Sequence, residues 1–265
     1  PSSFTLNAPQ EKAYQSILNQ FQEKDVVLLH GITGSGKTEI YIKLIQEALV
    51  NGDQVLYLLP EIALTTQIVV RLKRIFGEQV GIYHSKFSDN ERVEVWKSIV
   101  EGKYPFVVGV RSSVFLPFKN LGLIIIDEEH ETSFKQVDPA PRYHARDVAI
   151  MLAHQQKAKV LLGSATPSME TYYQAKQDKY GLVVLKERFG AAQLPAMHFI
   201  DTKYANRMKL MKGGFSVDLI EVLAENLKQG KQSLLFQNRR GYSPYLQCQD
   251  CDWIATCHQC DVSLT

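Results

Sequence analysis

The residues with the clearest chemical potential are those at 31–38, which read GITGSGKT and match the pattern G-x-x-x-x-G-K-[ST]. They follow an apolar run that ends before His30 and precede a helical pattern that starts near Thr38. Glycines let successive backbone N–H groups face phosphate oxygens, and the positive end of the next helix adds to the attraction. A chance glycine-rich turn is the alternative. We expect the loop to bind the phosphates of a nucleotide through Gly31, Ile32, Thr33, Gly34, Ser35, Gly36, Lys37 and Thr38, with Lys37 at the β and γ phosphates and the Thr38 hydroxyl on Mg²⁺.

An acidic box follows the apolar run 123–126, where the sequence reads Asp127-Glu128-Glu129-His130. Ligands of an open parallel sheet bind at the carboxyl ends of its strands, so these carboxylates are predicted to lie beside the phosphate loop. Asp127 is expected to hold Mg²⁺ directly or through water, and Glu128 to act as general base on the water that attacks the γ-phosphate. His130 is interpreted as a sensor between the γ-phosphate and a nucleic-acid groove. The alternative is an ordinary solvated turn.

The elements that must position these groups alternate along the chain. Short apolar runs predict strands, and apolar residues at helical spacing predict the helices between them, one of which Ser88 and Glu91 begin with a capping box. This order indicates an α/β fold, a parallel sheet with helices on both faces. The strands are predicted at 26–29, 55–59, 106–110, 123–126, 160–162 and 197–200.

The pattern breaks at 202–214, which is basic and ends in a Gly-Gly pair, and we interpret it as an interdomain linker. A helical face containing Val217, Ile220, Leu223 and Leu227 follows, and then a strand is predicted at 233–236. A second α/β domain is therefore expected to begin after the linker and to be cut short.

The amino-acid composition excludes fewer classes of protein than the motifs do. The 265 residues carry 30 basic and 28 acidic side chains, so net charge does not identify an anionic partner. No apolar stretch reaches the length of a membrane span and no leader stands at the start, so we expect no membrane partner and a cytoplasmic protein.

Together the motifs resemble those of superfamily 2 helicases, and among them the primosomal helicases of replication restart. The resemblance is carried by GITGSGKT, LLPEIALT at 58–65, GVRSSVFLPF at 109–118, DEEH, GSATPS at 163–168, FQNRRGYSP at 236–244 and the paired cysteines. It implies a RecA-like first lobe at 1–201, the linker at 202–214, the start of a second lobe at 215–245 and part of a zinc-binding insertion at 246–265. It also implies that Gln10 reads the adenine edge.

The resemblance further implies which residues meet DNA. Loops that follow strands would grip single-stranded DNA through Glu61, Leu64, Thr65, Arg111 and Ser112. An aromatic and basic loop at 134–146 would relay DNA contact to the nucleotide through Phe134, Lys135, Tyr143 and Arg146, or else it packs on the sheet edge. Ser164 and Thr166 would transmit the phosphate state to the DNA groove, and Pro167 suits the first turn of the next helix.

Four cysteines form two C-x2-C pairs, each a half-site for Zn²⁺: Cys248 with Cys251, and Cys257 with Cys260. Their separation is short for one zinc ribbon, and the resemblance implies that each pair finds its partners further downstream, which makes two structural zinc sites. One tetrahedral site or a redox pair are the alternatives.

The resemblance implies an ATP-driven 3′ to 5′ DNA helicase of bacterial replication restart, associated with the nucleoid. Its partners would be single-stranded and forked DNA, the primosome proteins and single-stranded DNA-binding protein. ATP, Mg²⁺ and Zn²⁺ are the expected cofactors, and the piece with one complete lobe is expected to hydrolyse ATP poorly alone. Two other classes stay open: a P-loop kinase or GTPase, and a zinc-bearing DNA-binding scaffold with a regulatory ATPase.

Overall fold

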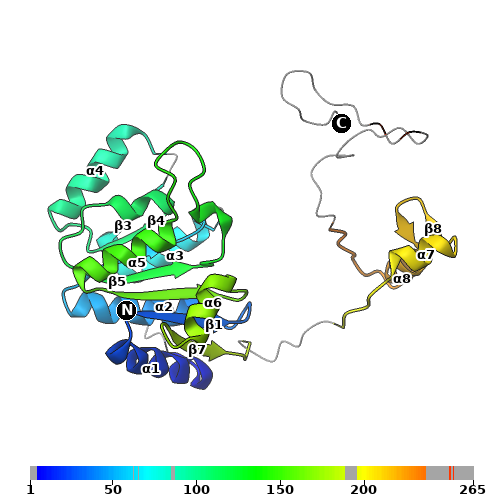
Figure 1. Ribbon diagram of the computed structural model, residues 1–265, viewed down its shortest axis with the longest axis horizontal. Helices are drawn as coiled ribbons and strands as arrows, with labels where there is room; N and C mark the ends of the chain where they lie inside the picture. The colour runs from blue at the N-terminus through cyan, green and yellow to red at the C-terminus, as the bar shows by residue number, and fades with distance from the viewer. Residues whose placement is uncertain are drawn as a thin grey trace. The chain divides into compact units, whose positions relative to one another are not determined.

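Seven parallel strands form the sheet that positions the phosphate loop and the acidic box (Figure 1). The computed structural model describes residues 5–61, 63–64, 66–84, 87–188, 196–236, 251 and 253. In space the strand order is β3-β4-β2-β5-β6-β1-β7. The strands are β1 (Val26–Gly31), β2 (Gln54–Leu58), β3 (Val80–Tyr83), β4 (Phe106–Gly109), β5 (Leu121–Asp127), β6 (Lys159–Ser164) and β7 (Gly181–Leu185).

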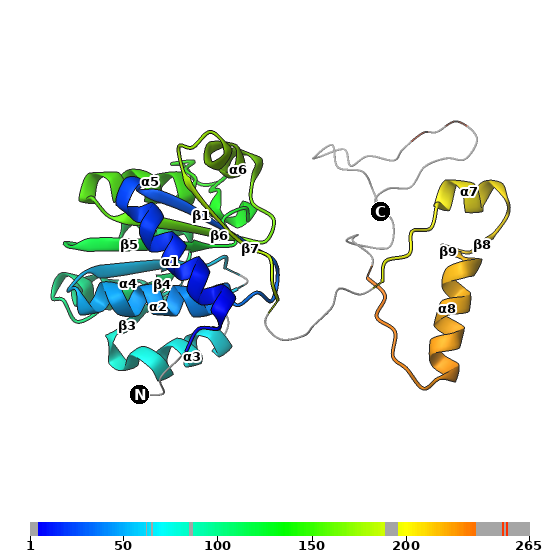
Figure 2. The same ribbon diagram turned by 90° about the horizontal axis from the view of Figure 1, so that it is seen from below.

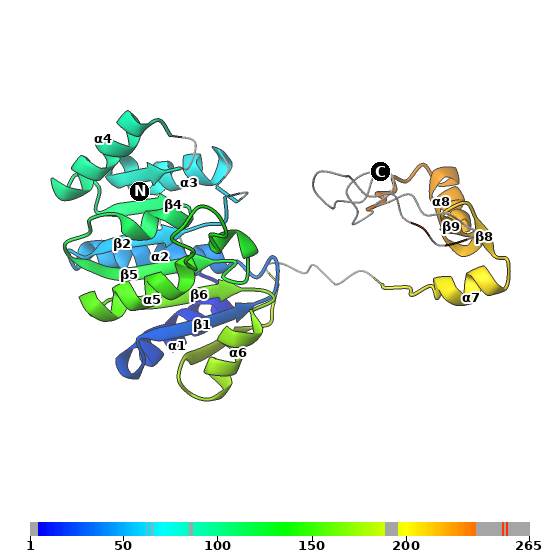
Figure 3. The same ribbon diagram turned by 45° about the horizontal axis from the view of Figure 1, so that its top comes forward.

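Helices cover both faces of this sheet, as the sequence predicts. One apolar cluster joins the sheet to α1 (Ala8–Glu23), α2 (Lys37–Val50) and α3 (Thr66–Phe76). The other joins the opposite face to α4 (Asp89–Val100), α5 (Ala145–Gln156) and α6 (Met169–Lys176). Figure 2 shows α5 and α6 on the side of the sheet away from α2 and α3, and Figure 3 shows α5 along β5 and β6. The α/β expectation is confirmed.

Burial on both faces explains why the strands read as continuous apolar runs. In β2 all five residues are buried, and successive side chains enter opposite clusters, Leu56 in one and Tyr57 in the other.

The predicted capping box of α4 is present, because the Ser88 hydroxyl accepts from the Glu91 N–H and the Glu91 carboxylate accepts from the Ser88 N–H. Asn7 and Gln10 form a second capping box at α1.

In the part of the chain that forms the seven-stranded sheet, two strands and one helix were not predicted from the pattern. β3 has four residues, and β7 is an edge strand whose Val184 is exposed. α5 presents its small residues Ala145, Ala149 and Ala153 to the sheet. Three 3-10 turns complete this part of the chain: η1 (Gly77–Gln79), η2 (Arg111–Phe115) and η3 (Thr132–Phe134).

The chain divides into two units, Pro1–Gln193 and Leu194–Thr265. In the second unit, α7 (Thr202–Arg207), β8 (Met211–Lys212), β9 (Phe215–Ser216) and α8 (Val217–Lys228) follow one another, and β8 and β9 pair antiparallel. The helix predicted at 217–227 is confirmed. The segment interpreted as a linker therefore contains a helix and half of a hairpin. The domain boundaries themselves stay a prediction.

Two strands predicted in this unit are wrong. Residues 197–200 and 233–236 are not in strands, and their apolar side chains are exposed: Phe199 is 91% and Leu234 is 96% exposed. Apolar runs indicate strands only where a sheet covers them, and in the described residues neither segment pairs with one. No helix among the described residues has the length and apolar character needed to cross a membrane.

Candidate nucleotide and magnesium site

The phosphate loop connects β1 to α2 and has the backbone that phosphate binding needs. Gly34 and Gly36 have φ of 77° and 80°, in the left-handed region that favours glycine. Gly36 is the N-cap of α2, and no described side chain caps that helix. Its first N–H groups are thus left for an anion.

Two polar side chains in the loop are buried and directed inward. Lys37 is 9% exposed, and its Nζ donates to the Gly31 carbonyl at 2.9 Å. The Ser35 hydroxyl is buried, and no described group pairs with it. Buried polar groups are nearly always paired, so the loop has donors that suit phosphate oxygens.

Gln10 braces this loop from α1. It is 1% exposed, its Oε1 accepts from the Asn7 N–H at 3.0 Å, and its Nε2 lies 3.4 Å from the carbonyl oxygens of Ser35 and Gly36. A Cβ at Gly36 would lie 2.1 Å from the Gln10 amide nitrogen. In this conformation both ends of the amide are used inside the protein, so the predicted contact with adenine requires it to turn outward and stays a prediction.

Asp127 ends β5, two strands from β1 in the sheet, and its carboxylate is held from several sides. Tyr41 donates to Oδ1 at 3.0 Å, Tyr57 donates to Oδ2 at 3.3 Å, and the Glu128 N–H donates to Oδ1 at 3.1 Å. Burial and then the charge of Glu128 raise the pKa of Asp127, while the Tyr41 hydrogen bond and the charge of Lys37 act against this rise. Asp127 is level with Gly163 on β6, and Gly163 is level with Leu29 on β1, so the acidic box and the phosphate loop follow their strands at the same end of the sheet.

Glu128 is turned away from the core beside Asp127. Its φ of 48° is left-handed, and its side chain is 38% exposed. The carboxylate is therefore open to water, as a general base requires. Its oxygens, the Asp127 carboxylate and the Thr38 hydroxyl are hard oxygen donors of the kind that Mg²⁺ prefers. The individual roles of these residues stay predictions.

His130 connects the acidic box to the GSATPS segment. Its Nδ1 lies 2.8 Å from the Ser164 hydroxyl and 3.6 Å from the Glu128 carboxylate, and its Nε2 lies 3.4 Å from the Thr166 hydroxyl. The Thr166 N–H donates to Ser164 Oγ at 2.9 Å. The predicted sensor and the predicted coupling residues thus form one hydrogen-bonded chain.

His30, which was not predicted as a site residue, connects the phosphate loop to the GSATPS segment. It lies directly before the phosphate loop, and its Nε2 is 3.2 Å from the Ala165 carbonyl oxygen. Its ring meets the Tyr172 ring edge to face. Its position at the carboxyl end of β1 was the signal available in the sequence.

Glu129 and Arg146 form a buried ion pair that was also not predicted. Glu129 is fully buried and accepts from Arg146 Nη1 at 3.0 Å, from the Ser168 N–H at 2.7 Å and from Thr171 Oγ1 at 2.8 Å. Arg146 also donates to Ser168 Oγ and to Asp147. Its side chain is 12% exposed, so the prediction that Arg146 contacts DNA is corrected: its donors are used to fix α5 and α6 to the acidic box.

Phe134 requires the same kind of correction. It is 1% exposed and packs in the apolar cluster under α5, so it is a core side chain and cannot stack on a base in this conformation. The prediction that Pro167 lies in the first turn of the next helix is wrong. Ser168 is the N-cap of α6, so Pro167 precedes the helix.

The remaining residues predicted to meet DNA gather around Arg111. Glu61, Arg111 and Ser112 line one cavity of about 40 Å³, and Arg111 donates to the carbonyls of Ser133 and Lys135. Leu64 is half-buried and Lys135 is exposed. Tyr143 meets the exposed ring of Phe115 at 4.9 Å between centroids, and Phe115 was not predicted. Thr65 lies outside the described residues.

Three of the four predicted zinc ligands, Cys248, Cys257 and Cys260, also lie outside the described residues. Cys251 is exposed. Among the residues that are described, no three His, Cys, Asp or Glu side chains are grouped as metal ligands.

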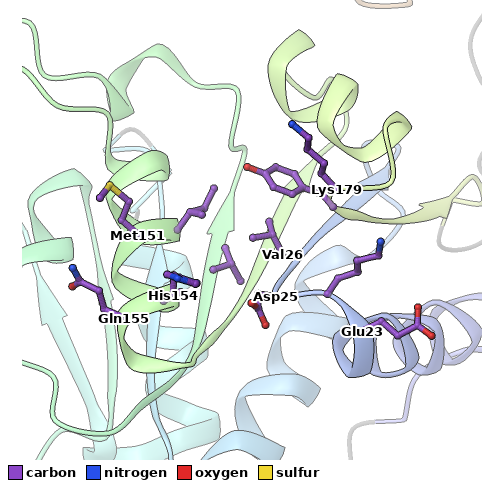
Figure 4. A pocket seen from close by; sticks show the side chains of 12 residues that line it. Glu23, Asp25, Val26, Met151, His154, Gln155 and Lys179 are labelled. Carbon is purple, nitrogen blue, oxygen red and sulfur yellow. The ribbon is translucent and has the colours of Figure 1, made fainter.

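A larger cavity of about 530 Å³ lies away from this chemistry (Figure 4). Its lining includes Asp25 and Val26 at the start of β1, and Met151 and His154 of α5. The phosphate loop follows the carboxyl end of β1, whereas this cavity lies at the amino end of the same strand, so the two sites are at opposite ends of the strands.

The chain belongs to the DEAD/DEAH box helicases, whose family model matches residues 7–175. It is similar to the replication restart protein PriA of Bacillus subtilis (strain 168), with 44% identity over 98% of this chain and 32% of that protein. It is equally similar to the PriA of Haemophilus influenzae, with 44% identity over 98% of this chain and 35% of that protein. The resemblance drawn from the motifs is confirmed. The chain spans about a third of the length of these relatives.

A solved structure of RecG bound to a three-way DNA junction shares the fold. It has a TM-score of 0.50 and 22% sequence identity, and it covers 72% of this chain and 25% of the RecG chain.

Proposed function

We propose that this chain is the ATP-binding part of an ATP-dependent DNA helicase or translocase that acts in replication restart. The observation that carries the proposal is the strand register: Asp127 on β5 is level with Gly163 on β6, and Gly163 is level with Leu29 on β1, so the acidic box and the phosphate loop follow their strands at the same end of the parallel sheet. The similarity to PriA supports the choice of process.

In this proposal the phosphate loop holds the triphosphate through its backbone N–H groups and Lys37. Thr38 and Asp127 would hold Mg²⁺, whose positive charge would stabilise the negative charge that develops on the phosphates. Glu128 accepts a proton from the attacking water. His130 passes the state of the site to Ser164 and Thr166 through the contacts of 2.8 and 3.4 Å.

DNA contact is proposed for the surface around Arg111, with Glu61, Ser112, Lys135 and Tyr143. The cavity that Glu61, Arg111 and Ser112 line supports their acting together. Arg111 also contacts the backbone of 133–135, which joins this surface to the loop that leads to Arg146 and hence to Glu129.

The finer features rest on the resemblance to the PriA proteins. These are 3′ to 5′ movement, recognition of forked DNA, assembly with primosome proteins and single-stranded DNA-binding protein, two structural zinc ions, and a cytoplasmic, nucleoid-associated setting. The two C-x2-C pairs support the zinc sites by their ligand type.

The test is the ATPase rate of the full-length protein with and without forked DNA, compared with its Lys37→Ala variant. Hydrolysis stimulated by DNA in the wild type and abolished in the variant is expected. Fork binding without stimulated hydrolysis would instead indicate a scaffold with a regulatory ATPase.

A further inference from the structure

Two buried tyrosines meet Asp127 from different elements. Tyr41 lies on α2, one turn after the phosphate loop, and Tyr57 lies on β2. Both are almost fully buried, and their rings meet edge to face at 5.8 Å between centroids. Their hydroxyls donate to different oxygens of one carboxylate, Tyr41 to Oδ1 and Tyr57 to Oδ2. The proposed phosphate contacts do not involve either tyrosine.

The hydrogen bonds leave the two oxygens of Asp127 unequal. A carboxylate offers about four acceptor positions, two on each oxygen. At Oδ1 the Tyr41 hydroxyl and the Glu128 N–H occupy both positions. At Oδ2 the Tyr57 hydroxyl is the only donor among the residues that the structure describes, so one position stays open.

Gly163 leaves the space that Tyr41 needs. It lies on β6 in register with Asp127, and a Cβ built on it would be 1.8 Å from the Tyr41 hydroxyl. β6 pairs with β1 and β5 on its two sides, so its backbone cannot move aside without disturbing both pairings. A side chain at 163 would therefore displace the Tyr41 hydroxyl from Asp127.

We propose that Tyr41 and Tyr57 are positioning residues, which orient Asp127 so that Oδ2 alone receives the magnesium ion of the nucleotide or a water bound to it. A carboxylate that is already oriented does not have to reorganise when the metal arrives. The inference rests on the proposed function, because it concerns the metal of an ATP site.

The test measures binding of a fluorescent ATP analogue to the full-length protein, first in EDTA and then across a Mg²⁺ titration. The variants are Tyr41→Phe and Tyr57→Phe, each of which removes one hydroxyl. Tyr14→Phe is the matched control, because Tyr14 is also buried and donates to a carboxylate, that of Glu47, at 2.5 Å.

We expect the variants to change the Mg²⁺ dependence of analogue binding but not the affinity measured in EDTA. In Tyr41→Phe the Mg²⁺ concentration for half-maximal tight binding rises roughly tenfold, the usual scale of one hydrogen bond to a charged group, while affinity in EDTA stays within about twofold of wild type. Tyr57→Phe raises this Mg²⁺ concentration less, because the hydrogen bond from Tyr57 to Asp127 is longer than that from Tyr41. Tyr14→Phe shifts neither. Gly163→Ala, if it folds, shifts the Mg²⁺ requirement in the same direction as Tyr41→Phe.

Two results would overturn the inference and leave the proposed function intact. One is a Tyr41→Phe titration that coincides with that of Tyr14→Phe. The other is an equal loss of affinity with and without Mg²⁺, which would make the hydroxyls ordinary structural hydrogen bonds. Wild-type protein that binds the analogue with no dependence on Mg²⁺ would instead refute the proposed ATP site, and this inference with it.

Discussion

Replacing Arg146 with alanine tests the buried ion pair behind the acidic box. Glu129 is fully buried, and Arg146 is the only cation among its described hydrogen-bond partners. Without the guanidinium its charge keeps only the donors of Ser168 and Thr171. Removing one partner of a buried ion pair typically costs about 3–5 kcal/mol, because the other charge is left uncompensated.

That loss is large enough to measure directly by thermal unfolding. In a unit of roughly this size each kcal/mol lowers the midpoint by about 2–4 °C, so Arg146→Ala should melt roughly 10 °C below wild type. Arg142→Ala is the control, because Arg142 is exposed in the same loop. It should stay within about 0.5 kcal/mol of wild type.

A double-mutant cycle with Glu129→Gln separates the pair from its surroundings. If the two charges interact, the double variant loses less stability than the two single variants together. Strict additivity would refute the reasoning. So would an Arg146→Ala variant that melts like Arg142→Ala but no longer binds single-stranded DNA, since this would restore Arg146 as a DNA contact.

Three further predictions concern single side chains. Ser88→Ala removes the capping box of α4 and should cost about 1 kcal/mol in a denaturant titration; no change in the midpoint would mean that the cap is not used. Because the pKa of Asp127 is raised on folding, the folded protein keeps that proton to higher pH than the unfolded chain, and stability falls as the pH rises through this range. The melting midpoint of Asp127→Asn minus that of wild type should therefore increase from about pH 4 to neutral pH, and a difference that does not change with pH would contradict this. His130→Ala breaks the contact with Ser164, so in the full-length protein it should reduce stimulation of the ATPase by DNA at least about tenfold while ATP binding stays within about twofold; unchanged stimulation would exclude His130 as the connection.

The sequence allowed the site to be predicted where chemistry is confined to one short segment. The phosphate loop and the acidic box each follow a buried strand, and parallel strands bring their carboxyl ends to one edge. The order of the strands, in which β6 lies between β1 and β5, cannot be predicted from either motif. It places Ser164 within hydrogen-bonding distance of His130.

The errors arose where a side chain's partner is remote in the chain. Arg146 and Phe134 have the residue types of a DNA-binding loop, but Glu129 pairs with the first, and the cluster under α5 buries the second. The apolar face of α5 consists of alanines, which give a weak periodic signal. At 197–200 an apolar run that His198 interrupts was interpreted as a strand, and in the described residues no sheet covers it.

The central claim is that one magnesium nucleotide is held between the loop around Lys37 and the carboxylate of Asp127. The most direct test is a crystal structure of the protein with Mg²⁺ and a non-hydrolysable ATP analogue. We predict that Lys37 Nζ leaves the Gly31 carbonyl to contact the β and γ phosphates, with the metal, or a water bound to it, on Asp127. A triphosphate bound elsewhere, or a metal that does not reach Asp127 even through a water, would contradict the account.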